Sequence, residues 1–149
     1  MNPPRRSVQK QEEPDLGILA ARFLWAFQRE LFEKLAEQGH PEVRPRHAPV
    51  LAFLDRDGTR AAELARISGR PRQLITTLVD ELVELGYVER HPDPADGRAK
   101  LVVPTKHGLD EMKRGDAIVR SIEERLAGQI GDDALAGVKE ALRAAAADQ

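Results

Sequence analysis

The sequence predicts a mainly α-helical fold with one small β-hairpin. Apolar residues recur every three or four positions through most of the chain, which is the spacing of one face of a helix. One stretch differs: two short strand-like runs at 87–91 and 99–103 flank a segment rich in Pro, Asp and Gly. That pattern indicates a hairpin inside an otherwise helical chain.

The composition is that of a single globular domain. The chain has 149 residues, of which 41% are hydrophobic and 32% charged. The sequence has no apolar run long enough to span a membrane and no start typical of a signal peptide, so we expect a cytoplasmic protein without a membrane partner. It contains no cysteine, which excludes disulfides, thiolate zinc sites and thiol nucleophiles.

The N-terminal part is predicted to be an arm followed by two helices. Residues 1–14 are polar, contain three prolines and are expected to form a flexible arm, with residues 15–149 forming a single domain. Asp15 is a suitable N-cap for a helix over 16–38, whose apolar residues lie on more than one side and must therefore be covered on more than one side. A shorter helix is predicted over 46–56.

The middle of the chain has the pattern of a helix-turn-helix. A short helix over 61–68 is followed by Gly69 and by a longer helix over 71–85. We predict that the longer helix buries a leucine stripe, namely Leu74, Leu78, Leu82 and Leu85. The hairpin follows, with a long tip over 92–97.

Two further helices are predicted after the hairpin. Thr105 is the expected N-cap of a helix over 106–129, and Asp132 is the expected N-cap of the last helix. The sequence shows no internal repeat.

The exposed face of the 71–85 helix is the first candidate for a nucleic-acid interface. It carries polar and basic residues near its N-terminal end, namely Arg70, Arg72, Gln73, Thr76 and Thr77. Such side chains can read base edges in the major groove, while the helix N-terminus favours phosphate. The alternative is a solvated amphipathic face, and the helix alone does not decide between the two.

The hairpin favours the nucleic-acid interpretation. Arg98 and Lys100 lie at and behind its tip, and a protruding arginine can enter a narrow minor groove. Asp93 and Asp96 are interpreted as acceptors that shape the turn and orient the Arg98 guanidinium through a charge-assisted hydrogen bond.

The segment HPDPADGRAKLVVPTKHG resembles the wing signature of the MarR family, in which Asp-Pro-x-Asp-x-Arg leads into a strand and then Thr-x-x-Gly. The matching residues are Asp93, Pro94, Asp96, Arg98, Thr105 and Gly108. The preceding ITTLVDELVELGYVERHPDP also resembles that family's recognition helix and first wing strand, and the order of elements agrees from about Asp15 to the end.

This resemblance implies a winged helix-turn-helix homodimer that binds a palindromic operator and is often released by a small ligand. Residues 15–45 and 106–149 would form the dimerisation helices, and 46–105 the DNA-binding part. The resemblance assigns base or backbone contacts to Arg72, Gln73, Thr76 and Thr77, and a minor-groove role to Arg98. Thr77 stands where the family often has a basic residue, and Pro104 is expected to shorten the wing strand.

Two further sites can be considered between the dimerisation helices and the winged helix. Trp25, His47, Phe53 and Met112 are candidates for an effector pocket, with ordinary core packing as the favoured alternative. His47 and His107 could meet near Glu33 or Glu111 as metal ligands, but their spacing is not a ligand motif. We therefore expect no metal and no cofactor.

Three functions can be compared. The first is a sequence-specific regulator of transcription that binds double-stranded DNA as a homodimer and acts as a repressor, either constitutively or under the control of a small-molecule effector. The second is a winged-helix module that binds a protein instead of DNA. The acids in the C-terminal half of the 71–85 helix favour this alternative. An enzyme is not expected, because the sequence has no Gly-rich phosphate loop, nucleophile and base at motif spacing, or suggestive carboxylate pair.

Overall fold

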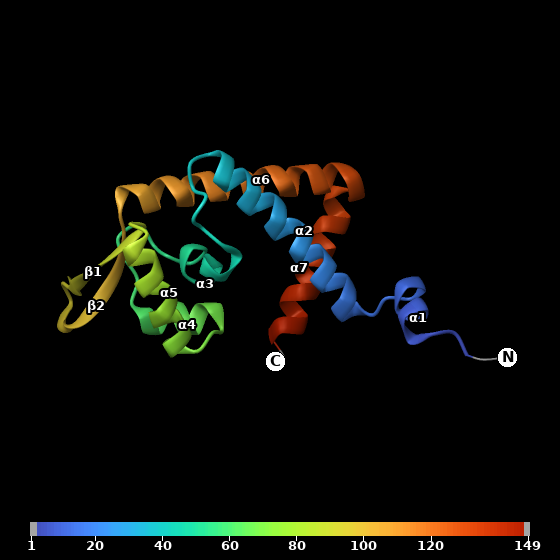
Figure 1. Cartoon of the computed structure of the whole chain (residues 1–149), viewed down its shortest axis with the longest axis horizontal. Helices are drawn as coiled ribbons and strands as arrows, with labels where there is room; N and C mark the ends of the chain where they lie inside the picture. Colours follow the sequence, from blue (N-terminus) through green and yellow to red (C-terminus); the bar gives the residue numbers. More distant parts are fainter. Residues whose placement is uncertain (1–2, 148–149) are drawn as a thin grey trace.

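The computed structural model describes residues 3–147, and Figure 1 shows how their elements are arranged. The elements are α1 (Arg6–Glu12), α2 (Leu16–Glu37), a 3-10 turn η1 (Pro45–His47), α3 (Ala48–Leu51), α4 (Ala61–Ser68), α5 (Arg72–Glu84), β1 (Val88–Asp93), β2 (Asp96–Pro104), α6 (Lys106–Ile130) and α7 (Asp132–Ala147). The predicted mainly α-helical fold with one hairpin is confirmed. Within residues 3–147, no helix is both long and apolar enough to span a membrane.

Helix α1 was not predicted. It lies within the segment expected to be a flexible arm, and none of its residues is buried. Lys10 at its end forms an ion pair with Asp15. Asp15 also accepts a hydrogen bond from the Ile18 amide at 3.0 Å, which confirms it as the N-cap of α2.

The apolar core has two parts. The larger lies inside the winged-helix portion and is formed by Val43, Val50, Leu51, Leu54, Leu64, Ile75, Leu78, Val79, Leu82, Tyr87, Val88 and Val102. The smaller joins α2 to α6 through Leu35, Ile118 and Ile122. The half-buried Phe32 of α2 packs against both parts and Met112 of α6 packs against the larger one, so α2 and α6 both support the winged-helix portion.

The helix predicted over 46–56 is shorter than expected. It is divided into η1 and the four-residue α3, and residues 52–57 form a turn. The hydroxyl of Thr59 accepts a hydrogen bond from the Asp55 amide at 3.0 Å, which holds this turn in place of a further helical turn.

Helix α5 buries a different stripe from the predicted one. Leu78 and Leu82 are buried as expected, but Leu74 and Leu85 remain 40% and 38% exposed. Ile75 and Val79 are buried in their place. The reason is that α5 packs against α3, α4 and β1 on the side that carries Ile75 and Val79, and both sets of residues satisfy the helical spacing.

The hairpin has a tighter tip than predicted. The two strands pair antiparallel from Val88 opposite Pro104 to Asp93 opposite Asp96, with an irregularity between Pro92 and Asp93. Only two residues therefore lie between the strands, and Pro104 extends the second strand where we expected it to shorten it. Thr59 and Val102 exchange two backbone hydrogen bonds of 2.9 Å, which join the hairpin to the body.

Helix α6 connects the winged-helix portion to the C-terminal helix. Thr105 is its N-cap, as predicted, because the threonine hydroxyl accepts from the Gly108 amide at 3.1 Å. The hairpin lies near the start of α6 and α7 descends from its end (Figure 1). Asp132 is the first residue of α7 and not its cap, since the Leu135 amide donates to the carbonyl of Gly131.

Candidate nucleic-acid interface

A groove lined by basic side chains runs between α5 and the hairpin. We call it the basic groove, and its lining residues are Arg60, Ala61, Ala62, Arg72, Thr76, Val79, Arg90, Arg98, Ala99, Lys100 and Val102. Five of these residues carry a positive charge and none carries a negative charge. The basic groove thus brings together four of the predicted DNA-contacting residues: Arg72 and Thr76 from α5, and Arg98 and Lys100 from β2.

The basic side chains differ in whether they have an ionic partner. The Arg60 Nε lies 2.6 Å from an Asp93 oxygen, and an Arg90 guanidinium nitrogen lies 2.6 Å from an Asp80 oxygen. In contrast, Arg72, Arg98 and Lys100 form no ion pair within residues 3–147. These three exposed side chains are therefore available to an external anion such as phosphate.

The N-terminal end of α5 adds further groups suited to an anion. Pro71 precedes the helix and provides no side-chain cap, so the amides of the first turn are not satisfied by a capping side chain. The Thr76 and Thr77 hydroxyls each donate to a carbonyl one turn earlier, at 3.1 Å. Their methyl groups and remaining lone pairs stay available on the exposed surface of the helix.

The two aspartates of the hairpin shape its turn, but one of them acts differently from our prediction. Asp93 accepts from the Ala95 amide at 2.9 Å and from Arg60, and these bonds, the first more than the second, lower the pKa of its carboxyl. Asp96 accepts from the backbone amide of Arg98 at 3.1 Å. The expected bond to the Arg98 guanidinium is not formed, because Asp96 turns toward the backbone of the tight tip.

Arg60 was not identified from the sequence. It precedes α4, and its pair with Asp93 joins the helix-turn-helix to the base of the hairpin tip. The two partners are 33 residues apart, and nothing in the local pattern of either indicates the contact.

The remaining predicted DNA-contacting residues lie elsewhere on α5 and the preceding turn. Arg70 and Thr77 line a second groove, beside α2 and α3, together with Leu24, Phe53 and Leu74. Gln73 is exposed on α5 and lines neither groove. The predicted residues are therefore all exposed, but they are divided between the basic groove, the second groove and the surface of α5 at Gln73.

The residues proposed for an effector pocket do not share a pocket. Trp25 is 69% exposed on α2, Phe53 lines the second groove, and Met112 lines a separate cavity under α6. His47 is buried and already has partners: its Nδ1 accepts from the Arg44 amide at 3.0 Å, and its Nε2 lies 2.9 Å from a Glu81 oxygen. Within the single described chain these four residues therefore do not line one pocket, and an effector site formed by them stays a prediction.

The histidines do not form a metal site in the part of the chain that the structure describes. His47 binds Glu81 instead. The His107 ring stacks on Tyr87 at a centroid distance of 4.4 Å and lies tilted against His40 at 4.6 Å. No group of three or more His, Cys, Asp or Glu residues within 3–147 could hold a metal ion.

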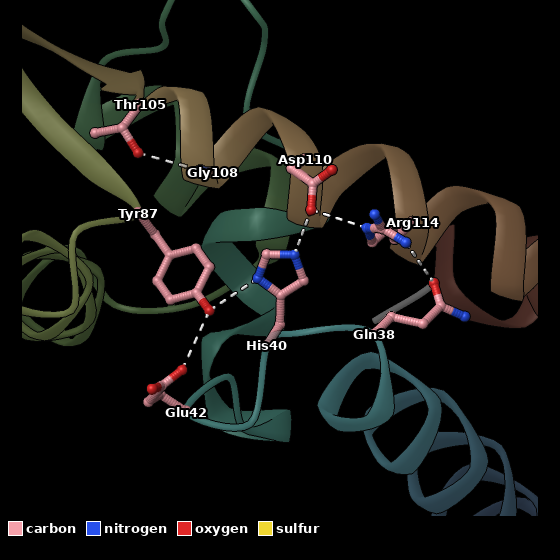
Figure 2. A network of polar contacts seen from close by, with 8 residues as sticks. All are labelled: Gln38, His40, Glu42, Tyr87, Thr105, Gly108, Asp110 and Arg114. Atoms are coloured by element: carbon pink, nitrogen blue, oxygen red, sulfur yellow. Dashed lines mark hydrogen bonds and ion pairs between the residues drawn. The ribbon is translucent and has the colours of Figure 1, made fainter.

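A polar network that sequence reasoning missed connects the end of α5 to α6 (Figure 2). His40 Nε2 lies 2.8 Å from an Asp110 oxygen, and His40 Nδ1 lies 3.0 Å from the Tyr87 hydroxyl. Arg114 donates to the same Asp110 oxygen, and the bonds from His40 and Arg114 lower the pKa of the Asp110 carboxyl. Tyr87 lies three residues beyond Glu84, the last residue of α5, so this network links the segment between α5 and β1 to α6 and helps to orient α5.

The sequence matches the family model described as MarR family over residues 43–99, which run from the loop before α3 into the second strand of the hairpin. No curated protein matches the chain significantly.

Solved structures with the same fold include several regulators. CouR from Rhodococcus jostii RHA1, bound to p-coumaroyl-CoA, has 28% sequence identity and a TM-score of 0.73 over 89% of this chain and 92% of that chain. The transcriptional repressor CouR bound to a 23-mer DNA duplex has 22% identity and a TM-score of 0.73 over 98% and 99% of the two chains. The S. aureus MepR–DNA complex has 17% identity and a TM-score of 0.76 over 92% and 100%.

Proposed function

We propose that the chain is a MarR-family transcriptional repressor that binds a specific double-stranded DNA sequence. The observation that carries this proposal is the basic groove. Arg72 of α5 and Arg98 and Lys100 of β2 line it without an ionic partner, and no acidic residue is part of its lining. The DNA complexes of CouR and MepR, which have the same fold, support extending DNA binding to this chain.

In the proposed complex, α5 enters the major groove and the hairpin acts as a wing over the neighbouring minor groove. Arg72, Gln73 and Thr76 would contact base edges, and the uncapped amides at the start of α5 would bind phosphate. Arg98 would reach the minor groove from the hairpin tip, with Lys100 on the adjacent backbone. This arrangement uses only the N-terminal half of α5.

Two of the three acids in the second half of α5 have basic partners, whereas Glu84 forms no ion pair within residues 3–147. Asp80 pairs with Arg90, and Glu81 pairs with Arg46 and His47. Their charges are therefore partly neutralised within the chain, which weakens the case for a basic protein partner on this helix.

The exposed apolar side chains of α2 and α7 support a homodimer. Those on α2 are Leu16, Leu19, Phe23, Leu24 and Trp25, and those on α7 are Val138 and Leu142, each of them 48% to 72% exposed. No described residue of α7 is buried, so contacts within one chain cover little of its apolar surface. We propose that 15–45 and 106–149 contain the dimerisation helices, as the family resemblance implies.

The dimer should be obligate, since separating the two chains would expose all of this apolar surface. Light scattering is expected to give a mass of about 33 kDa, twice the 16.6 kDa of one chain, down to the lowest measurable concentration. A dilute monomer with full helical circular dichroism would contradict this expectation. A two-fold dimer would in turn bind a palindromic operator, and a small ligand between its parts would release it.

Replacing Arg98 with alanine tests the role of the wing. We expect operator affinity to fall on the order of 10-fold or more, while the free energy of unfolding changes by no more than about 0.5 kcal/mol, because the side chain is exposed and unpaired. Asp96→Ala should cause a smaller loss, since it frees the Arg98 amide without removing a DNA contact.

The matched control is Arg120→Ala, which removes an exposed arginine of α6 outside the basic groove. Fluorescence anisotropy with DNA selected from random fragments would compare the three variants with the unaltered chain. Equal affinity of the Arg98 and Arg120 variants would make the wing a structural hairpin and favour the protein-binding alternative.

A further inference from the structure

A small apolar cavity lies between α2, α3 and α6. Its volume is about 90 Å³, and its apolar lining includes Leu31, Phe32, Leu35, Val43, Leu51 and Met112. Only two lining residues are ionisable, Glu111 and Asp116, and both are acids. The cavity separates the helices proposed for dimerisation from the first helix of the winged-helix portion.

Glu111 is buried in this cavity without a partner. The residue is only 5% exposed, and its Oε2 atom has no hydrogen-bond partner within residues 3–147. Burial, together with the negative charge of Asp116, raises the pKa of the Glu111 carboxyl to about 7. A buried polar atom without a partner lowers the free energy of unfolding. An apolar residue at position 111 would therefore stabilise the core more than glutamate does.

We propose that the cavity binds a small cationic amine whose apolar body contacts the lining and whose ammonium group donates to Glu111. A basic side chain is absent from the lining, so a carboxylate ligand would face two acids with no compensating charge. An ammonium group, in contrast, supplies the missing hydrogen bond and the opposite charge.

The position of Glu111 connects the cavity to the DNA-binding surface. Its neighbour on α6, Asp110, binds His40, which binds the hydroxyl of Tyr87 in the segment between α5 and β1 (Figure 2). A ligand that shifts this turn of α6 would change the bonds that orient α5. The inference rests on the proposed repressor function for its regulatory consequence, whereas ligand binding itself can be measured without DNA.

The chain offers a specific reporter for this cavity. It contains two methionines, Met1 and Met112, and Met112 lines the cavity. In protein labelled with ¹³C at the methionine methyl groups, one signal therefore reports on the cavity and the other is an internal control. Three probes of similar shape distinguish the ligand class: isobutylamine, isobutanol and isobutyrate.

Isobutylamine is expected to shift the Met112 signal saturably and to bind more tightly than isobutanol, with isobutyrate weakest. Glu111→Gln should weaken isobutylamine binding on the order of 10-fold, because a charge-assisted bond is lost, and should leave isobutanol binding nearly unchanged. Glu124→Gln, which removes an exposed acid further along α6, is the matched control and should bind isobutylamine like the unaltered chain.

The proposal is overturned if isobutyrate binds as tightly as the amine, if Glu111→Gln does not weaken the amine, or if millimolar amine leaves the Met112 signal unmoved. Repeating the titration on the operator complex tests the regulatory consequence separately, with release of DNA expected. A chain that binds the amine but no DNA would refute the proposed function and leave the cavity assignment intact.

Discussion

Gly108→Ala is expected to destabilise the folded chain by at least about 2 kcal/mol, despite the higher helix propensity of alanine. Gly108 lies in the first turn of α6, where an added Cβ would overlap the carbonyl oxygen of Tyr87. That oxygen belongs to the backbone and accepts from the Thr105 amide at 3.0 Å, so it cannot move aside without breaking this bond. Helix α6 would have to move away from the corner between α5 and β1.

Gly128→Ala provides the matched control within the same helix. An added Cβ at Gly128 would meet no atom within 4 Å, so this substitution should stabilise the chain by roughly 0.5 to 1 kcal/mol. Urea denaturation at equal protein concentration would compare both variants with the unaltered chain. The close approach at Tyr87 would be refuted if the two substitutions changed stability in the same direction by similar amounts.

Glu111→Gln is expected to stabilise the chain at alkaline pH, by up to about 3 kcal/mol at pH 8 relative to its effect at pH 5. The pKa of Glu111 is raised from 4.5 to about 7 by burial and by Asp116. In the folded chain the carboxyl thus keeps its proton at pH values where the unfolded chain has lost it. The folded state binds more protons, and the stability of the unaltered chain falls as pH rises from about 4.5 to 7.

Glutamine cannot ionise, so the variant should lack this part of the pH dependence. Urea denaturation of both proteins between pH 5 and pH 8 would measure the difference. Glu124→Gln controls for the removal of one negative charge from α6. Parallel stability curves for the Glu111 variant and the unaltered chain would show that the buried carboxyl is not the cause.

The sequence was sufficient wherever the determining interactions are local. The caps Asp15 and Thr105 act on amides three residues away, and α4 ends at the adjacent Gly69, which adopts the left-handed conformation. The wing was found for the same reason, because its turn formers and its basic residues are adjacent in the chain. Arg98 and Lys100 could therefore be assigned to the exposed hairpin before its geometry was known.

Orientation was harder to predict than the presence of an element. Leu74 and Ile75 both continue a helical stripe through Leu78 or Val79, and only the packing of α5 against α3 and α4 decides which is buried. The direction of the Asp96 carboxylate likewise depends on the two-residue tip of the hairpin. The run of turn-forming residues had predicted a longer tip.

Contacts between distant residues could not be predicted from one sequence. His40 is 47 residues from Tyr87 and 70 from Asp110, and no local pattern relates them. Glu111 is a similar case: in the sequence it is one of many acids of an amphipathic helix, and only the packing of α2 and α3 over α6 makes it buried and unpartnered.

The salt dependence of binding to selected and to random DNA tests the central claim most directly. Fluorescence anisotropy of the unaltered chain should give an affinity for the selected duplex at least about 10³-fold higher than for random duplex at physiological salt. The logarithm of both affinities should fall linearly with the logarithm of salt concentration, because cations such as Arg72 and Lys100 displace counterions from phosphates. Equal affinities for the two duplexes, or binding insensitive to salt, would contradict sequence-specific recognition through the basic groove.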